Sequence, residues 1–325
     1  MLMRFGRPDS RSIFEALCLA LCSAALVTEL AAMPFAYADD ANGFGSRLQA
    51  FREMMANKRE NDALKVSEED LGAHTQNVVR DSFDGRDIIL YVPLLLPAQG
   101  QRGMVVALHG GGGNAQNIKD HLKMDGVAEK YGFIVAYLNG SDASARLPGK
   151  MKAWNAGNGC CGEPYKTKVD DVGYISDAVH YLARKYGVNP KRVFGIGHSN
   201  GAMMTETLMC ETDLYQSAIS LAGSLMTEVD SCPAARGKTI LAIHGMADAN
   251  VPPGGGKGTR GATNIAFKSE ADSRSMFESS GGKYIIQWLQ GTDHSLEHIG
   301  ATIQRTEGIS LAEKAARFFG LAPGK

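Results

Sequence analysis

The stretch 192–204 decides the fold and reads Arg-Val-Phe-Gly-Ile-Gly-His-Ser-Asn-Gly-Ala-Met-Met. Its first residues, 192–196, are typical of a buried strand, and residues 202–209 have the pattern of a helix. Between them stands a Gly-x-Ser-x-Gly motif, in which a serine occupies a sharp turn between a strand and a helix. The glycines on either side of Ser199 suit such a turn, because neighbouring segments pack too closely for a side chain there. We therefore expect Ser199 to be a nucleophile exposed at the end of a strand.

Short apolar runs recur on both sides of this stretch. Runs of this kind are typical of strands that are buried on both faces of a parallel sheet. They lie at 104–108, 133–138, 218–221, 239–243 and 283–289.

Helical patterns lie between the apolar runs. Residues 172–186 carry one apolar stripe, with Asp170 or Asp171 as the expected N-cap. Ser310 and Glu313 form the sequence pattern of a capping box at the start of a last helix. Alternating strands and helices predict an α/β fold with a mostly parallel central sheet flanked by helices.

The N-terminal region has three predicted parts. Basic residues, an apolar stretch over 13–27 and the small-residue site Ala36-Tyr37-Ala38 predict a secretory signal over residues 1–38. The alternative, a membrane anchor, is disfavoured because this stretch is shorter than the ~20 residues of a span. Residues 39–325 are expected to form a single domain, which opens with a short amphipathic helix over 44–55. Asp84-Gly85, between the strand-like runs 75–79 and 87–92, then predicts a hairpin. We expect a secreted protein, extracellular or periplasmic.

Composition excludes several classes of protein. The 325 residues include 34 Lys and Arg against 35 Asp and Glu, which leaves no electrostatic footprint for nucleic acid or an anionic membrane. A hydrophobic share of 44% with 21% charged residues is that of a globular chain. The cysteines that remain after signal removal suggest disulfides in an exported protein, with three pairings open. These are Cys160, Cys161, Cys210 and Cys232, and no Cys-x-x-Cys with a histidine partner points to zinc.

A base and an acid for Ser199 are expected after later strands. A serine hydroxyl needs a base to take its proton, and in this motif's usual chain order an acid comes next and a histidine last. Asp248 follows the run 239–243, and His294 follows the run 283–289. Ser199, Asp248 and His294 are therefore the expected triad. His298 is the alternative base and Asp293 the alternative acid, whereas His244 is expected to be structural.

The glycine run after the first parallel strand predicts an oxyanion hole. A tetrahedral oxyanion needs two preorganised N–H donors, one from the residue after the nucleophile and one from such a loop. Asn200 and Gly111 are the expected donors, with Gly110 or Gly112 as alternatives to Gly111. A phosphate-binding loop is disfavoured because no Gly-Lys-Ser/Thr follows. The expected substrate-binding residues are His109, Gly110, Trp154 and His198, although Trp154 suits a core position equally well.

Several motifs together resemble the secreted α/β-hydrolase esterases of the polyhydroxybutyrate depolymerase and feruloyl/acetylxylan esterase group. The resemblance implies the α/β-hydrolase fold, the triad named above and a Cys210–Cys232 disulfide. The chain departs from the depolymerases, which carry His-Thr-Trp-Pro around the catalytic histidine where His-Ser-Leu-Glu stands at 294–297. The resembling motifs are Ile-Leu-Tyr-Val-Pro at 89–93, Ala-Leu-His-Gly at 107–110 with Gly-Asn-Ala at 113–115, Trp-Asn at 154–155 with Cys-Cys-Gly at 160–162, Val-Asp-Asp-Val-Gly-Tyr-Ile at 169–175, the stretch 192–204, and Ile-His-Gly through Val-Pro over 243–252.

The expected function is that of a secreted serine carboxylesterase that works through an acyl-enzyme without a metal or organic cofactor. The departure at 294–297, together with the lack of a C-terminal polymer-binding domain, favours feruloyl or acetyl esters of plant polysaccharide over polyhydroxybutyrate. A depolymerase of short-chain hydroxyalkanoates is the first alternative. A serine peptidase of the same fold and a catalytically silent polymer-binding protein are the others. We expect a monomer whose partner is the ester substrate.

Overall fold

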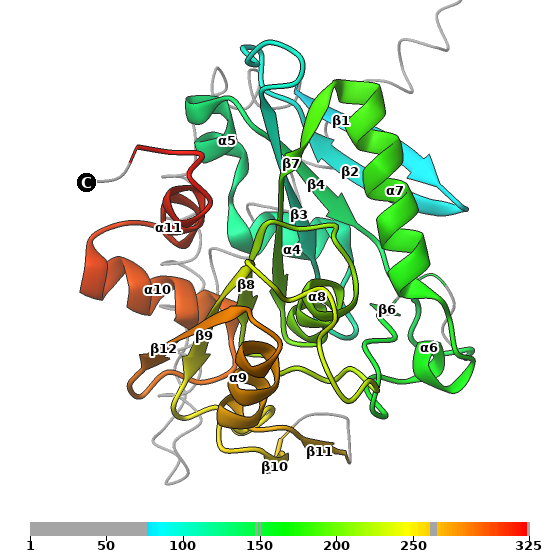
Figure 1. Ribbon diagram of the computed structural model, residues 1–325, viewed down its shortest axis with the longest axis vertical. Helices are drawn as coiled ribbons and strands as arrows, with labels where there is room; N and C mark the ends of the chain where they lie inside the picture. The colour runs from blue at the N-terminus through cyan, green and yellow to red at the C-terminus, as the bar shows by residue number, and fades with distance from the viewer. Residues whose placement is uncertain (1–76, 147–148, 150, 261–264, 324–325) are drawn as a thin grey trace, which may run out of the picture. The chain divides into compact units, whose positions relative to one another are not determined.

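An eight-stranded sheet runs through the middle of the molecule, in the order β1-β2-β4-β3-β7-β8-β9-β12 (Figure 1). The two N-terminal strands pair antiparallel, and β2 also pairs antiparallel with β4. From β4 to β12 all neighbours are parallel. The strands are β1 (Val78–Phe83), β2 (Arg86–Tyr91), β3 (Arg102–Leu108), β4 (Ile134–Leu138), β7 (Val188–His198), β8 (Ser217–Leu221), β9 (Thr239–Gly245) and β12 (Lys283–Leu289).

This structure is a computed structural model, and it describes residues 77–146, 149, 151–260 and 265–323. The predicted signal over 1–38 and the predicted helix over 44–55 lie outside the described residues. Both stay predictions, as does the start of the domain at residue 39. Among the residues that are described, no helix is both long enough and apolar enough to cross a membrane.

Every apolar run of the sequence forms a strand of this sheet, so the mostly parallel sheet is confirmed. The hairpin is also confirmed, and its first strand, Val78–Phe83, continues beyond the predicted end at residue 79. Residues 75 and 76 of the predicted run lie outside the described residues. The predicted end was wrong because β1 is an edge strand whose polar side chains alternate with half-buried ones. An edge strand of this kind has no continuous apolar run to mark it.

Helices cover both faces of the sheet and enclose two separate cores. One core joins the sheet to α7 (Asp171–Tyr186), α8 (Asn200–Glu211) and α9 (Glu270–Ser279). The other joins the opposite face to α4 (Ala115–Leu122), α5 (Asp125–Tyr131), α10 (Leu296–Glu307) and α11 (Leu311–Phe318). In Figure 1, α10 and α11 lie on the left and α7 on the right. The remaining elements are α6 (Glu163–Lys166) and the short strands β5 (Ser141–Asp142), β6 (Lys152–Ala153), β10 (Gly256–Lys257) and β11 (Ala266–Phe267).

Capping residues set the helix starts largely as the sequence indicates. Asp170 is the N-cap of α7, since its carboxylate accepts a hydrogen bond from the backbone N of Gly173 at 2.8 Å. Ser310 caps α11 by accepting from the backbone N of Glu313 at 3.1 Å. The second half of the predicted capping box is absent there, because the Glu313 carboxylate accepts from Tyr131 and Arg317 instead.

The parallel strands bring their carboxyl ends to one edge of the sheet. The strand β3 ends before the glycine loop, β7 before Ser199, β9 before Asp248 and β12 before His294. Ligands of open α/β sheets bind at this edge. A functional site is therefore expected at the carboxyl edge of the sheet.

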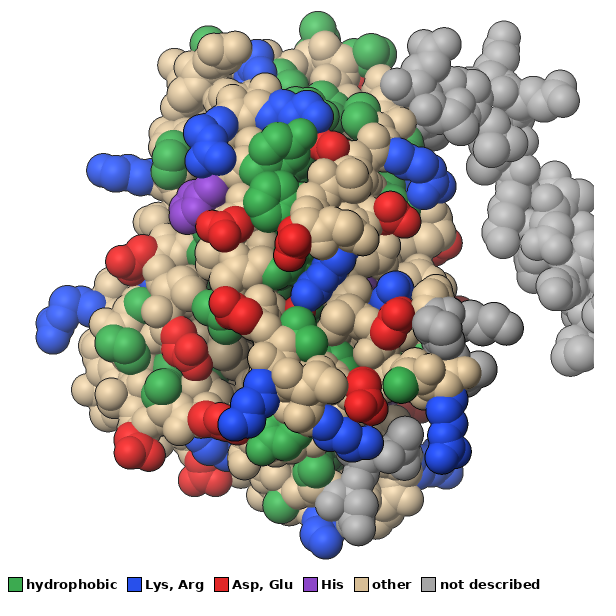
Figure 2. All heavy atoms as spheres, turned by 90° about the vertical axis from the view of Figure 1, so that its right-hand side faces the viewer, with side chains coloured by type: hydrophobic (Ala, Val, Ile, Leu, Met, Phe, Trp, Pro, Cys, Tyr) green, Lys and Arg blue, Asp and Glu red, His purple; other side chains and the backbone are tan. Residues whose placement is uncertain are grey.

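On the face that Figure 2 shows, acidic and basic side chains of the described residues are interspersed and neither sign forms a block.

Candidate active site

Ser199 stands at the turn between β7 and α8 in a backbone conformation that only close packing maintains. Its φ of 54° and ψ of −119° lie where residues other than glycine are rarely found. A Cβ on Gly197 would collide with the backbone oxygen of Gly201, and one on Gly201 would collide with the backbone oxygen of Leu108. The motif's glycines therefore allow the turn to pack against its own helix and against β3.

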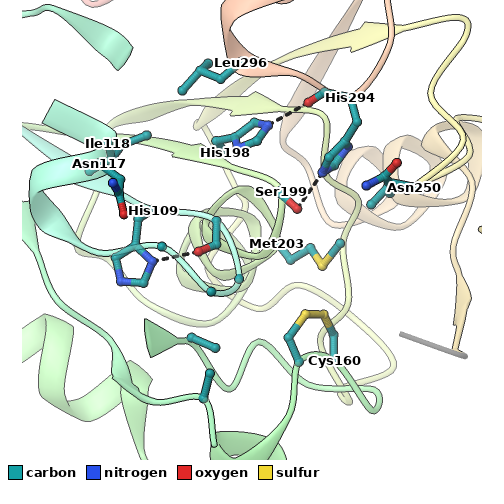
Figure 3. Close-up of a pocket in the computed structure, with 18 of the residues that line it drawn as sticks. His109, Asn117, Ile118, Cys160, His198, Ser199, Met203, Asn250, His294 and Leu296 are labelled. Atoms are coloured by element: carbon teal, nitrogen blue, oxygen red, sulfur yellow. Dashed lines mark hydrogen bonds between the residues drawn. A yellow bond between two sulfur atoms is a disulfide. The ribbon is translucent and has the colours of Figure 1, made fainter. Parts of the chain in front are cut away.

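Three side chains from three loops form a continuous hydrogen-bonded chain. The Ser199 hydroxyl lies 2.8 Å from Nε2 of His294, and Nδ1 of His294 lies 2.7 Å from Oδ2 of Asp248. Figure 3 shows the first of these contacts, with the imidazole of His294 pointing at the serine oxygen. The other carboxylate oxygen of Asp248 accepts from the backbone N of Asn250 at 2.8 Å and of Val251 at 2.9 Å. The structure thus brings together the three residues expected as a triad.

The alternative base and acid pair with each other, away from the serine. Nδ1 of His298 lies 2.8 Å from Oδ1 of Asp293, and the His298 side chain is 61% exposed. Both groups therefore stand outside the chain that reaches Ser199.

Electrostatics keep Asp248 ionised. Burial raises the pKa of this carboxyl, but hydrogen bonds from His244 and His294 outweigh burial and hold the pKa well below its usual range. An ionised Asp248 can accept the Nδ1–H of His294, which leaves Nε2 free to take a proton from Ser199.

The His198 side chain holds the loop that carries His294. Its Nε2 donates to the backbone oxygen of His294 at 2.9 Å, and Figure 3 marks this bond with a dashed line between His198 and His294. Burial lowers the pKa of His198 to about 4, so the ring is neutral at pH 7. The residue borders the cavity, as expected, but its Nε2–H is engaged with the loop that carries His294.

The glycine loop leaves two candidate donors for an oxyanion. The N–H of Gly112 donates to Lys152 O at 2.8 Å and that of Gly113 donates to Gly110 O at 3.0 Å. Gly112, one of the alternatives, is therefore committed elsewhere, while Gly110 and Gly111 stay candidates. A Cβ built on Gly111 would lie 3.6 Å from the Cβ of Asn200. The backbone of Gly111 thus runs beside Asn200, whose own N–H belongs to the first turn of α8 and has no helical acceptor.

Trp154 does not line the cavity, so that expectation was wrong. The side chain is 0% exposed, and its Nε1 donates to the backbone oxygen of His109 at 3.0 Å. Its backbone is held by Asn200, whose Oδ1 accepts from Trp154 N at 2.7 Å and whose Nδ2 donates to Trp154 O at 3.0 Å. A tryptophan fits here because its indole fills the core while its single donor reaches a buried carbonyl. Trp154 therefore supports the start of the glycine loop from the core side, through its hydrogen bond to His109 O.

His109 has a similar supporting position, although it also borders the cavity. Burial lowers its pKa to about 4. Its Nδ1 donates to the backbone oxygen of Gly110 at 2.8 Å, and its Nε2 accepts from the backbone N of Gly140 at 3.0 Å. The neutral ring therefore joins the glycine loop to the segment after β4.

A cavity of about 760 Å³ opens beside Ser199. Sequence reasoning missed most of its apolar wall, because these side chains come from separate loops and helices with no common spacing. Cys160 and Cys161, whose pairing was left open, are joined by a disulfide that borders the same cavity, and Figure 3 shows it facing the serine across the pocket. The missed apolar residues are Ile118, Met151, Met203, Val251, Phe267 and Leu296.

A second disulfide lies away from the cavity wall. Cys210, near the end of α8, is bonded to Cys232, 22 residues further along the chain. This pairing is the one that the family resemblance implied. Within the residues that the structure covers, no group of three His, Cys, Asp or Glu side chains is arranged to hold a metal ion.

Comparisons with known proteins point to esterases. A family profile described as phospholipase/carboxylesterase matches residues 94–297. A feruloyl esterase B of Neurospora crassa is 30% identical over 118 residues, 36% of this chain and 37% of that protein. An acetylxylan esterase of Coprinopsis cinerea is 32% identical over 131 residues, 38% of this chain and 31% of that protein. In both comparisons the matched segment is less than half of the relative's own length.

Solved structures share the fold at low sequence identity. The acetyl xylan esterase from Aspergillus awamori superposes with a TM-score of 0.50 at 18% identity, over 75% of this chain and 98% of that one. A carboxylesterase from Bacillus cereus gives a TM-score of 0.50 at 14% identity, over 73% and 94% of the two chains. At these identities the likeness concerns the arrangement of the sheet and helices alone.

Proposed function

The chain belongs to the phospholipase/carboxylesterase family, and from that membership we propose that it is a serine carboxylesterase that acts through an acyl-enzyme. Its fold is the α/β-hydrolase fold expected from the sequence. The observation that supports the proposal most is the chain of contacts from Ser199 to His294 at 2.8 Å and from His294 to Asp248 at 2.7 Å. This series of hydrogen bonds ends at Ser199 in the wall of the cavity, where a substrate carbonyl can reach the serine oxygen.

The proposed reaction has two halves. Ser199 Oγ attacks the ester carbonyl carbon while its proton passes to Nε2 of His294, and the carbonyl oxygen becomes an oxyanion. The backbone N–H groups of Gly111 and Asn200 stabilise that oxyanion. His294 then gives its proton to the departing alcohol oxygen, which leaves an acyl group on Ser199. Water repeats the sequence, with His294 as base, and releases the carboxylic acid.

Feruloyl or acetyl esters of plant polysaccharide are the proposed substrates. Two relatives are named for such esters. The cavity of about 760 Å³ is large enough for an aromatic acyl group, and its apolar wall suits a planar ring. We propose the polysaccharide-linked ester over polyhydroxybutyrate because no observation on the site favours the polyester.

Export is part of the same proposal. The predicted signal over 1–38 supports it, and so do the two disulfides, which form and persist in oxidising compartments. Mass determination of the mature protein, recovered from outside the cytoplasm, tests this point. We expect an N-terminus at residue 39; a mature chain that keeps residues 1–38 would contradict it.

Hydrolysis of methyl ferulate and p-nitrophenyl acetate tests the activity itself. We expect Ser199→Ala to lower kcat by about 10⁴-fold or more, as loss of a triad nucleophile does. Ser295→Ala is the matched control, because Ser295 also borders the cavity but lies outside the hydrogen-bonded chain. A Ser199→Ala enzyme as active as the Ser295→Ala enzyme would overturn the serine mechanism. Turnover of a peptide ester and a peptide bond, with none of either test ester, would move the assignment to a peptidase.

A further inference from the structure

A second histidine lies directly behind the proposed triad. His244 is the penultimate residue of β9 and is 0% exposed. Its Nε2 lies 3.1 Å from Oδ2 of Asp248, the same oxygen that accepts from His294. Its Nδ1 lies 2.6 Å from Oε1 of Glu270, the first residue of α9, which is 1% exposed. Both ring nitrogens of a buried histidine thus face carboxylates.

The contacts of His244 define where its protons sit. Nε2 also lies 2.9 Å from the backbone oxygen of Val251, which can only accept, so Nε2 carries a hydrogen. Nδ1 faces the Glu270 carboxylate at ion-pair distance. Burial alone lowers the pKa of His244, but the hydrogen bonds to Asp248 and Glu270 outweigh it and raise the pKa to about 9. Both nitrogens therefore donate at neutral pH.

The contacts continue behind Glu270 into the sheet and α8. The hydroxyl of Tyr284, on β12, lies 2.7 Å from Oε2 of Glu270 and 3.0 Å from Oε1 of Glu206. Burial and the nearby Glu270 raise the pKa of Glu206 to about 8, so this second carboxyl is neutral at pH 7 and adds no charge. The Glu270 carboxylate is thus held by two strands, through His244 on β9 and Tyr284 on β12, and it cannot turn away from His244 without losing a buried hydrogen bond.

We propose that His244 and Glu270 are positioning residues of this enzyme, which hold the Asp248 carboxylate toward His294 through a buried carboxylate–imidazolium–carboxylate arrangement. The inference rests on the proposed triad. His244 touches no substrate and acts only through Asp248. Two effects follow: the imidazolium fixes the orientation of Asp248, and its positive charge opposes a second positive charge on His294.

Two paired substitutions separate these effects. The amide nitrogen of a glutamine reaches the position of the histidine Nε2, and that of an asparagine reaches the position of Nδ1. His244→Gln with Glu270→Gln therefore keeps a neutral donor to Asp248, whereas His244→Asn with Glu270→Gln removes that donor. Glu270→Gln in both avoids leaving an unpaired buried carboxylate. His180→Gln, on the exposed face of α7, is the control for a histidine exchange.

The pH dependence of kcat/KM is the readout that a merely structural role would not move. Its acid limb reports the protonation of the free enzyme's essential base. Removing the positive charge of His244 should raise that midpoint, and removing the more distant negative charge of Glu270 offsets part of the rise. With an effective dielectric near 20, the net rise expected in both paired variants is about half to one unit. A loss of folded enzyme would scale the rates at all pH values and leave the midpoint where it is.

The two variants should differ in kcat. His244→Asn with Glu270→Gln loses a charge-assisted hydrogen bond to Asp248, so we expect kcat to fall roughly 10- to 100-fold with KM little changed. His244→Gln with Glu270→Gln should stay within about threefold of the unsubstituted enzyme, since its donor remains. The inference stands only if both midpoints rise and only the asparagine variant loses kcat. Any other pattern in folded variants overturns it.

A measurement on the unsubstituted protein covers the case in which a variant fails to fold. Ring ¹⁵N chemical shifts of labelled histidines should show His244 doubly protonated between pH 6 and 8, and a neutral His244 ring in that range overturns the inference. Ser199→Ala is assayed alongside. Activity that survives Ser199→Ala removes the proposed function itself. An inactive Ser199→Ala enzyme with unshifted paired variants removes only the role of His244 and Glu270.

Discussion

Replacing Asn200 with aspartate turns one hydrogen-bond donor into an acceptor and leaves the shape of the side chain the same. Asn200 is fully buried, and its amide makes two bonds to the backbone of Trp154, at 2.7 Å to N and 3.0 Å to O. In the aspartate variant a carboxylate oxygen would face the Trp154 carbonyl oxygen. One lost bond and the buried groups left unsatisfied cost about 1–3 kcal/mol each. We therefore expect a loss of about 3–5 kcal/mol in the free energy of unfolding at pH 8.

The cost should depend on pH with a definite sign. Burial beside a carbonyl raises the folded-state pKa of the introduced carboxyl above its unfolded value of about 3.9. The cost is then complete above the folded-state pKa and falls as pH drops through it, because the protonated carboxyl can donate to the Trp154 oxygen. The gap between variant and unsubstituted protein should be smaller at pH 5 than at pH 8.

Urea denaturation at the two pH values, followed by tryptophan fluorescence, measures this gap. Asn189→Asp is the control, because Asn189 uses only its oxygen, as acceptor from the backbone N of Lys191 at 2.9 Å. An aspartate keeps that bond, so the control should change stability by less than about 0.5 kcal/mol. A similarly small change in Asn200→Asp, or a cost independent of pH, would refute the role given to the Asn200 amide.

Three further outcomes are expected. Replacing Cys210 and Cys232 together with alanine should lower the free energy of unfolding by about 3 kcal/mol, as for a loop of 22 residues in the chain-entropy estimate, and an unchanged urea midpoint would contradict it. Trp154→Phe loses the indole hydrogen bond to His109 O and should lower the free energy of unfolding in urea by about 1–3 kcal/mol. Its KM for small esters should stay the same, and a large rise in KM would indicate that Trp154 contacts the substrate. His294→Ala should lower kcat by about 10⁴-fold, whereas His298→Ala should keep nearly the unsubstituted rate. A large loss of kcat in His298→Ala and none in His294→Ala would identify His298 as the base.

The sheet was predictable because most of its strands are buried on both faces. Strands such as β4 and β9 are buried at nearly every position, and the apolar runs 133–138 and 239–243 mark them in the sequence. The edge strand β1 lacks such a run, so its predicted end was wrong. The order of the strands in space comes from pairing between distant segments, which no local spacing encodes.

The arrangement of Ser199, Asp248 and His294 could be anticipated because parallel strands end at one edge of the sheet. The role of Trp154 could not, since an aromatic ring suits a core and a substrate wall equally well. His244 was expected to be structural, but its contact with Glu270 depends on α9 packing beside β9 and β12. The two carboxylates that flank His244 are brought together only by folding, so the sequence around His244 does not indicate them.

Covalent capture of the nucleophile tests the central claim most directly. The mature protein is treated with a fluorophosphonate, which phosphonylates an activated serine, and the adduct is located by mass spectrometry of the peptides. We expect one adduct per chain, on Ser199, formed at a rate that falls in step with ester hydrolysis when His294 is replaced by alanine. An adduct on any other residue, or continued ester hydrolysis after Ser199 is fully labelled, would contradict the account.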